Sequence, residues 1–215
     1  MTKADLSASL LTLTQWLSPA FPLGAFAWSH GLETAIARGD VACAPSLEAW
    51  LGTVLVIGTG RTDATLLAMA LAGAEPGDLA DTARALAPSA ERAAETEGQG
   101  AALARTVSAL TGRTIAPAPL PVALGVAARP LGLPTETVIA LYLQGFAGAI
   151  VSAAIRAVPL GQTEGQGVLA RLHPLIAAEA RAAPSRDPGH LGTAAFGADL
   201  AAMEHETQEV RLFRS

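Results

Sequence analysis

The stretch Val138–Ile155, which reads VIALYLQGFAGAIVSAAI, is almost wholly apolar and predicts a helix at the centre of the fold. It is at the lower length limit for a membrane span and is flanked by Glu136 and Arg156. Two glycines and a glutamine in its middle suit a closely packed core helix better than a helix that faces lipid. We therefore expect no membrane span, and a core helix that begins at Thr135 and runs through Ala157.

Helical patterns fill the rest of the chain as well. Apolar side chains recur at helical spacing and predict further helices over about 6–17, 46–57, 63–71, 79–86, 89–110, 122–131, 163–182 and 196–207. Ser46 is expected to cap the second of these, and Thr163 with Gln166 to form a capping box. β-Branched residues are scattered and no stretch alternates, which argues against strands. The predicted fold class is all-α, one helical-bundle domain over residues 1–215.

A second unusual stretch, Leu17–Ile36, reads LSPAFPLGAFAWSHGLETAI. Its two prolines require a turn or extended link, because neither can sit inside a regular hydrogen-bonded ladder. A helix is then expected from near Ala25, with Gly39 as a left-handed C-cap. Its apolar stripe would consist of Trp28, Leu32 and Ile36.

Composition narrows the class of protein. Of 215 residues, 51% are hydrophobic and only 15% are charged, so a folded core is expected and some apolar surface must be covered, most simply in a homo- or hetero-oligomer. The formal charge of −5 argues against nucleic acid as a partner. The single cysteine, Cys43, excludes an internal disulfide, and the start of the chain lacks a secretory pattern. We expect a cytosolic protein.

Catalytic and metal-binding motifs are not found. The only lysine is Lys3, so the chain has no phosphate-binding P-loop, and it has no Gly-x-Ser-x-Gly elbow. No two histidines have metal-ligand spacing. The acidic and basic residues of the helix over 89–110 (Glu91, Arg92 and Glu95) are interpreted as a solvated face. Glu204-His205-Glu206 is interpreted in the same way, with partner contact or metal ligation as alternatives. We predict no catalytic residue, no bound metal and no tightly bound cofactor.

The end of the chain suggests a contact with another protein. A flexible arm is expected over about 208–215, without fixed structure in isolation. It pairs apolar and guanidinium side chains in the order Arg211, Leu212, Phe213 and Arg214. Such an arm is suited to fold into a groove of a partner, and a frayed end is the alternative.

The stretch over 17–36 resembles the N-terminal signature of the UreF family of urease accessory proteins, in which Ser-Pro-x-x-Pro-x-Gly precedes an aromatic residue and Ser-x-Gly-Leu-Glu. Further stretches resemble the same family in the same order: 121–128, 131–134, 141–143, 151–154, 158–166 and 203–213. Each motif is weak alone, but together they span nearly the whole chain and are specific.

The resemblance implies an all-helical homodimer that takes part in nickel insertion into urease. In this family the protein binds the accessory protein UreD, called UreH in some systems, and the pair recruits the nickel-carrying GTPase UreG. The assembly then acts as a chaperone that loads nickel onto apo-urease. The resemblance thus implies a non-catalytic protein that influences a partner GTPase and handles the nickel cation through its partners.

The resemblance also implies roles for particular residues. Phe26 matches an aromatic position, often tyrosine, that is implicated in recruiting the GTPase, and phenylalanine removes the hydroxyl. Arg211 matches an arginine implicated in ordering the C-terminus and binding UreD. Gly192 stands where some relatives carry cysteine, which removes a metal contact there. The full set of candidate partner-binding residues is Phe26, Ser29, His30, Glu33, Arg211, Leu212, Phe213 and Arg214.

The sequence therefore supports a urease accessory scaffold as the first hypothesis. A scaffold of another assembly is the second. A helical hydrolase with a site between helices is the third, and it lacks a recognisable nucleophile or metal ligand set.

Overall fold

Helix α8 (Thr135–Ala157) runs through the middle of the molecule and packs most extensively against α9 (Gln162–Ala182). The computed structural model describes residues 3–215, except the side chains of residues 3, 4 and 190. It is all-helical over these residues, as predicted. The remaining α-helices are α1 (Lys3–Trp16), α2 (Leu32–Arg38), α3 (Ala44–Ile57), α4 (Thr59–Ala72), α5 (Pro76–Ala85), α6 (Ala90–Thr111), α7 (Leu120–Ala128) and α10 (Phe196–His205). Short 3₁₀ turns are η1 (Ala25–Ala27), η2 (Arg129–Leu131), η3 (Ala183–Ser185) and η4 (Pro188–His190).

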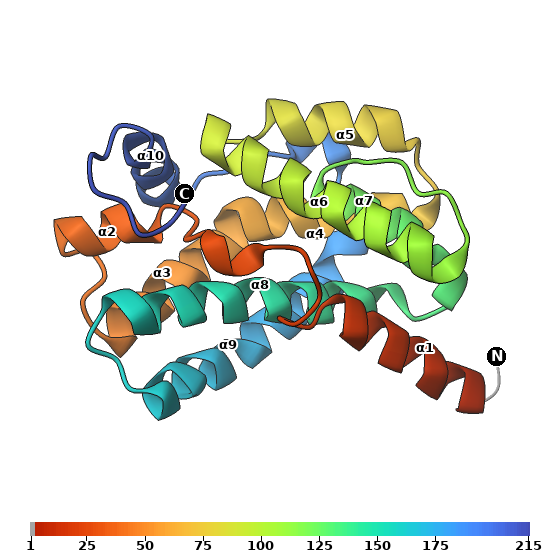
Figure 1. Cartoon of the computed structure of the whole chain (residues 1–215), viewed down its shortest axis with the longest axis horizontal. Helices are drawn as coiled ribbons and strands as arrows, with labels where there is room; N and C mark the ends of the chain where they lie inside the picture. Colours follow the sequence, from red (N-terminus) through yellow and green to blue (C-terminus); the bar gives the residue numbers. More distant parts are fainter. Residues whose placement is uncertain (1–2) are drawn as a thin grey trace.

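The apolar core surrounds α8. Helices α3, α4 and α9 cover it along much of its length, and α7 packs on α4 and α6 at the other side of the body (Figure 1). Both α8 and the stretch Ala44–Ala72 are long and apolar enough to cross a membrane by length and composition alone. Half of the apolar window of α8 and 67% of that of the other stretch are buried inside the protein. A core helix passes the same test, so this is weak support for a membrane span.

The helix in the second unusual stretch begins later than predicted. Residues 25–27 form only the η1 turn, and α2 begins at Leu32. His30 and Gly31 have φ values of 61° and 74°, and two left-handed residues in succession break a right-handed helix. A Cβ at Gly31 would lie 2.7 Å from the main-chain nitrogen of Ala202, so α10 approaches the backbone here. The C-cap at Gly39, with φ 85°, is confirmed.

Two predicted helix caps are wrong, by three residues in α3 and by two residues in α9. Helix α3 begins at Ala44 with Cys43 as N-cap, and Ser46 completes the capping box from inside the helix. Proline at position 45 is tolerated because the first turn has no hydrogen bond for it to break. Helix α9 begins at Gln162, where the carbonyl of Gly161 accepts the first helical bond from Gly165. Thr163 therefore lies inside the helix instead of capping it.

The C-terminal arm is packed instead of free. The chain turns back after α10 and ends between α2 and the N-terminal end of α6 (Figure 1). Phe213 is 7% exposed and Ser215 is fully buried. The prediction of a flexible arm missed this because the partners of the arm lie more than 100 residues away in the sequence.

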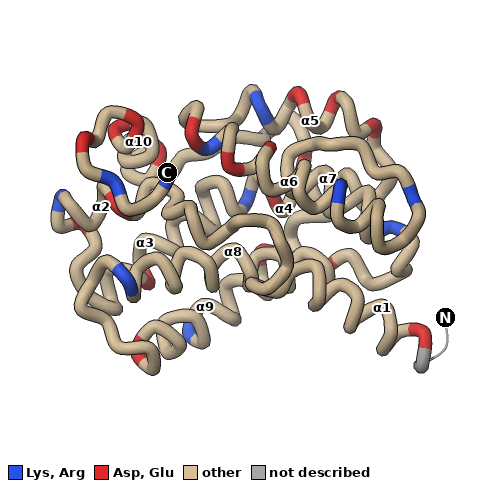
Figure 2. Tube along the Cα trace, in the orientation of Figure 1, with Lys and Arg blue, Asp and Glu red and all other residues tan. Residues whose placement is uncertain are grey.

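Charge is distributed unevenly over the molecule. Figure 2 shows α8 and most of α1 nearly free of charged residues, whereas acidic and basic residues gather on α2, α5, α6 and α10. The charged helices α2, α6 and α10 are also the ones that hold the C-terminal arm.

Candidate functional site

Two groups of candidate residues that are far apart in the sequence meet in the structure. The stretch that leads into α2 contacts the C-terminal arm directly. We call this contact the tail junction, and its members are Ser29, His30, Glu33, Glu91, His205 and residues 211–215.

Main-chain groups hold the two ends of the tail junction together. The amide of Ser29 donates to a main-chain oxygen of Ser215 at 2.7 Å, and the amide of Arg214 donates to the carbonyl of Ala27 at 2.8 Å. The left-handed backbone at His30 directs its own amide to the Ser215 hydroxyl at 3.2 Å. The unusual backbone of this stretch therefore forms a cradle for the arm.

The carboxylate of Glu33 is the central acceptor of the tail junction. Its Oε1 accepts the amide of Leu212 at 2.8 Å, and its Oε2 accepts the amide of Phe213 at 3.0 Å. The same Oε2 lies 3.2 Å from Nε2 of His205, which comes from α10. Glu33 is buried in α2, so these contacts replace the water that its charge would otherwise require.

A second carboxylate faces the other side of the His205 ring. Oε2 of Glu91, in the first turn of α6, lies 2.6 Å from Nδ1 of His205. Oε1 of Glu91 accepts from the Arg211 guanidinium at 2.7 Å. Helices α2, α6 and α10 and the arm are thus joined through one fully buried imidazole. The prediction that the segment around His205 is a solvated face is wrong for His205.

Arg156, at the end of α8, contacts both the exposed residue Phe26 and the buried residue Phe213. It donates to the carbonyl of Phe26 at 2.9 Å, and its guanidinium lies 4.6 Å from the centre of the Phe213 ring. Arg214 lies over the Trp28 ring in a similar way, at 5.6 Å. Cations stack favourably on aromatic faces, so both arginines help to orient the arm.

The inward side of α6 carries buried polar residues, which corrects the prediction of a solvated face. Arg92, Glu95 and Gln99 are all buried. Arg92 pairs with Glu95, and Gln99 donates to Glu95 at 3.1 Å. The Ser215 hydroxyl donates to Glu95 at 3.2 Å. These residues are covered because distant segments, including the arm, pack over this side of α6.

Deeper in the protein, Tyr142 of α8 donates to Asp63 of α4 at 2.6 Å. Burial raises the pKa of Asp63 to about 6, although the Tyr142 hydrogen bond and the charge of Arg92 oppose the rise. Burial lowers the pKa of Arg92 to about 10, against the attraction of Asp63. Burial, aided by the charge of Arg92, lowers the pKa of His30 well below its usual range, so this ring is neutral.

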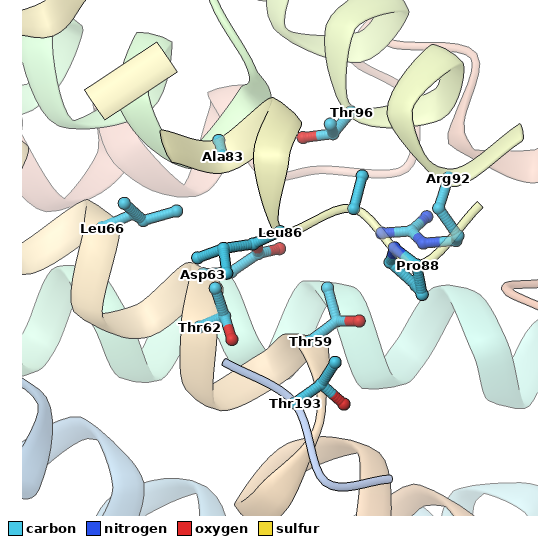
Figure 3. A pocket seen from close by; sticks show the side chains of 11 residues that line it. Thr59, Thr62, Asp63, Leu66, Ala83, Leu86, Pro88, Arg92, Thr96 and Thr193 are labelled. Carbon is cyan, nitrogen blue, oxygen red and sulfur yellow. The ribbon is translucent and has the colours of Figure 1, made fainter. Parts of the chain in front are cut away.

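Two cavities adjoin these polar groups. A groove of about 540 Å³ extends between the end of α1, the following loop and α8, and a pocket of about 20 Å³ lies between α4, α5 and α6. Figure 3 shows Asp63, Arg92 and Thr96 around the small pocket, and the same three residues line the groove. Nδ1 of His30 and Nε of Arg92 are buried and have no hydrogen-bond partner among the residues that the structure describes. Within residues 3–215, no group of three or more His, Cys, Asp or Glu side chains is placed to hold a metal ion.

Comparison with known proteins decides the family. The family model of UreF matches residues 41–173. The urease accessory protein UreF of Cereibacter sphaeroides strain KD131 is 63% identical over 213 residues, covering 98% of this chain and 100% of that protein. This chain belongs to the UreF family. The UreF proteins of Dinoroseobacter shibae (52% identical over 208 residues, 97% of this chain and 99% of that protein) and Paracoccus denitrificans (51% over 216 residues, 100% of both) agree.

The eight candidate residues of this UreF chain divide into a buried and an exposed set. Ser29, His30, Glu33 and Phe213 are buried and build the tail junction. The exposed set, which a partner could reach, comprises Phe26, Arg211, Leu212 and Arg214. Phe26 and Leu212 are each 74% exposed, which is unusual for large apolar side chains.

Sequence reasoning about this UreF chain missed four contributors: Glu91, Arg156, His205 and Asp63. The first three contact the predicted residues directly, and the fourth lines the groove. The only available signal was the Glu-His-Glu run around His205, because that run is a cluster of polar residues on a short helix. Nothing in the sequence places Glu91 next to it.

Proposed function

We propose that this chain is a non-catalytic scaffold for urease maturation in the cytoplasm. In this proposal it forms a homodimer, binds UreD (UreH) and recruits the GTPase UreG, whose activity it modulates. The assembly then inserts nickel into apo-urease, and nickel is its cargo, not a tightly bound cofactor. Membership in a family of urease accessory proteins supports this proposal, and the tail junction is the observation that carries it.

The arm is the proposed contact for UreD. Burial of Phe213 leaves Leu212 and Arg214 directed outward, so an ordered arm offers an apolar and a cationic contact side by side. Helix α10 adds an exposed apolar stripe at spacing i, i+4 and i+7, made of Phe196, Leu200 and Met203. The segment 187–210 has no lysine or arginine and carries the acids Asp187, Asp199, Glu204, Glu206 and Glu209. A partner with apolar anchors and a basic rim would match this surface.

Phe26 is the proposed contact for UreG. The Arg156 hydrogen bond to its carbonyl holds the η1 turn in place while the ring remains exposed. Aromatic side chains presented in this way are frequent anchors of protein interfaces. Because phenylalanine has no hydroxyl, the contact would be apolar.

Helix α1 is the proposed dimer contact. It extends from the body of the molecule (Figure 1), and Leu6, Leu10 and Leu11 are exposed on it, Leu11 to 71%. The end of α1 also lines the groove of about 540 Å³ beside α8. A second copy that inserts apolar side chains here would cover both features.

Co-purification with UreD and UreG from the same source, followed by sizing in solution, tests the proposal. Arg211→Ala is expected to weaken UreD binding about tenfold or more, Phe26→Ala to weaken UreG recruitment, and Leu11→Arg to give monomers. Leu110→Ala, which alters an exposed leucine on α6, is the matched control and should change none of these. Failure of the unaltered chain to bind either partner would refute the scaffold function.

A further inference from the structure

The groove of about 540 Å³ beside α8 has the size and the lining of a small-molecule site. Most of its wall is apolar and includes Phe21 and Leu141. Buried polar side chains from three helices line it as well, namely Asp63 of α4, Arg92 of α6 and Tyr142 of α8. Such a lining suits a ligand, because the apolar wall supplies affinity and the polar groups fix the orientation of the bound molecule.

Two buried polar atoms of the groove lining have no partner within the described part of the chain. Nε of Arg92 carries an N–H donor without an acceptor, and Nδ1 of His30 is unpaired as well. Arg92 and His30 are only 5% and 4% exposed. A buried donor without an acceptor costs free energy, and a molecule in the groove that supplied the missing partner would recover it.

Asp63 adds an unpaired acceptor to the same lining. Its Oδ2 accepts from the Tyr142 hydroxyl at 2.6 Å, whereas its Oδ1 receives no hydrogen bond from any residue that the structure describes. Figure 3 shows Asp63 and Arg92 on α4 and α6, and both also line the groove. Burial is the largest influence on the pKa of Asp63 and of His30, and the charge of Arg92 lowers both, so the three side chains lie near one another.

The charges of this lining favour a neutral ligand. The carboxylates of Asp63 and Glu95 accompany the single guanidinium of Arg92, and Glu95 already accepts from Arg92 and Gln99. An anion would satisfy Nε of Arg92 but would face the unpaired oxygen of Asp63. A cation would satisfy Asp63 but would offer no acceptor to Arg92. A neutral primary amide serves both, because its carbonyl oxygen accepts and its NH₂ group donates.

We propose that the buried polar part of this groove binds a small neutral molecule that carries a primary carboxamide on an apolar body. The carboxamide oxygen accepts from Nε of Arg92, one N–H donates to Oδ1 of Asp63, and the second N–H faces Nδ1 of His30. The apolar body lies against the apolar wall. This inference does not depend on the proposed scaffold function, because it concerns only groups of this chain.

Benzamide, benzoate and benzamidine test the proposal, because they share one ring and are neutral, anionic and cationic. They are titrated into ¹⁵N-labelled protein at about pH 8, where Asp63 is ionised. The indole N–H signal of Trp28, which lines the groove, reports binding, and that of Trp50, outside the groove lining, controls for general effects. Benzamide should shift the Trp28 signal to saturation and bind at least about tenfold more tightly than the other two, since each of these loses a hydrogen bond and meets a like charge.

Asp63→Asn changes the group that faces the ligand. The asparagine oxygen still accepts from Tyr142, and its NH₂ group then takes the place of Oδ1. The ratio of benzoate affinity to benzamide affinity should therefore rise at least about tenfold. Asp78→Asn removes the same charge from an exposed position in the first turn of α5, outside the groove, and should leave this ratio unchanged. Far-UV circular dichroism checks that both variants keep their helices.

Three results would overturn the proposal. Equal affinities for the three compounds would show that the groove accepts any aromatic molecule, and the absence of any Trp28 shift would show that it binds none of them. An unchanged affinity ratio in Asp63→Asn would show that the carboxylate does not select the neutral compound. None of these results bears on the scaffold function, and a chain that fails to bind UreD and UreG would leave the carboxamide site standing.

Discussion

Helices α6 and α8 have nearly the same length, 22 and 23 residues, but they differ in the polar side chains that they bury. The buried side of α8 is apolar apart from Tyr142, whereas α6 buries Arg92, Glu95 and Gln99 in its first half and apolar residues in its second half. An apolar side chain is stabilised by any close-packed apolar neighbour, because the hydrophobic effect has no direction. A buried polar side chain needs particular partners at particular positions. Helix α6 therefore depends on distant segments in a way that α8 does not.

The largest expected effect comes from breaking the polar side of α6. Arg92→Met leaves the Glu95 carboxylate buried without its cation and should lower the free energy of unfolding by about 3 to 5 kcal/mol. In the double variant Arg92→Met/Glu95→Gln, the neutral amide oxygen can still accept from Gln99 while the amide NH2 group donates to the Ser215 hydroxyl, and much of the loss should be recovered. Urea unfolding of the single and double variants measures both values. A single variant that loses less than about 1 kcal/mol would contradict a buried ion pair.

The apolar side of α8 should respond to loss of volume alone. Leu143 is fully buried, and Leu143→Ala should cost about 3 kcal/mol through lost burial and the cavity left behind. Leu110→Ala on the exposed side of α6 should cost less than about 0.5 kcal/mol. Thermal and urea unfolding compare the two. A similar small loss in both would show that the core around α8 closes over the gap.

Asp63 connects the two helices through its contacts with Tyr142 and its proximity to Arg92. Because the pKa of Asp63 rises from 3.8 to about 6 on folding, the folded chain binds this proton more tightly than the unfolded chain. The associated stability is present below about pH 4 and is lost as pH rises through about 6, by about 3 kcal/mol in total. Asp63→Asn removes this dependence while its oxygen still accepts from Tyr142. The variant should therefore gain stability relative to the original chain at pH 8 but not at pH 4, as measured by urea unfolding at each pH. An equal difference at both values would contradict the raised pKa.

The smallest effects come from two glycines in α6, Gly98 and Gly100, which lie only two residues apart. A Cβ at Gly98 would meet nothing within 4 Å, whereas a Cβ at Gly100 would lie 1.9 Å from the carbonyl oxygen of Ala118. Gly98→Ala should raise the free energy of unfolding by about 0.5 to 1 kcal/mol, because alanine favours helix. Gly100→Ala should lower it by about 1 to 3 kcal/mol, because main chain has to move. The sign of the change in melting temperature distinguishes the two, and a gain in both would show that the segment before α7 moves freely.

Local sequence patterns predict α8 and the extent of α6, but neither the burial of α6 nor the start of α2. The bounds of α8 were predicted to the residue, because a long apolar run between Pro134 and Val158 leaves little choice. The extent of α6 was also predicted closely: a helix was expected over 89–110, and α6 runs from Ala90 to Thr111 with Ser89 as N-cap and Gly112 as C-cap. Its burial was not, because the residues that cover it follow about 110 positions later. The start of α2 was not predicted, because it depends on distant contacts. The left-handed backbone at His30 directs its amide to Ser215 of the arm, and α10 packs closely against Gly31.

The sequence alone determines the helical class, the approximate helix positions and the membership in a family of urease accessory proteins. Each of these depends on local spacing or on motifs that can be read along the chain. Only the tertiary structure shows that His205 lies between Glu33 and Glu91, that the arm is held in the tail junction, and that Phe26 and Leu212 remain exposed. A hydrogen bond between buried groups requires their positions to within a fraction of an ångström. Such positions arise when distant helices pack together, and no local pattern of residues encodes them.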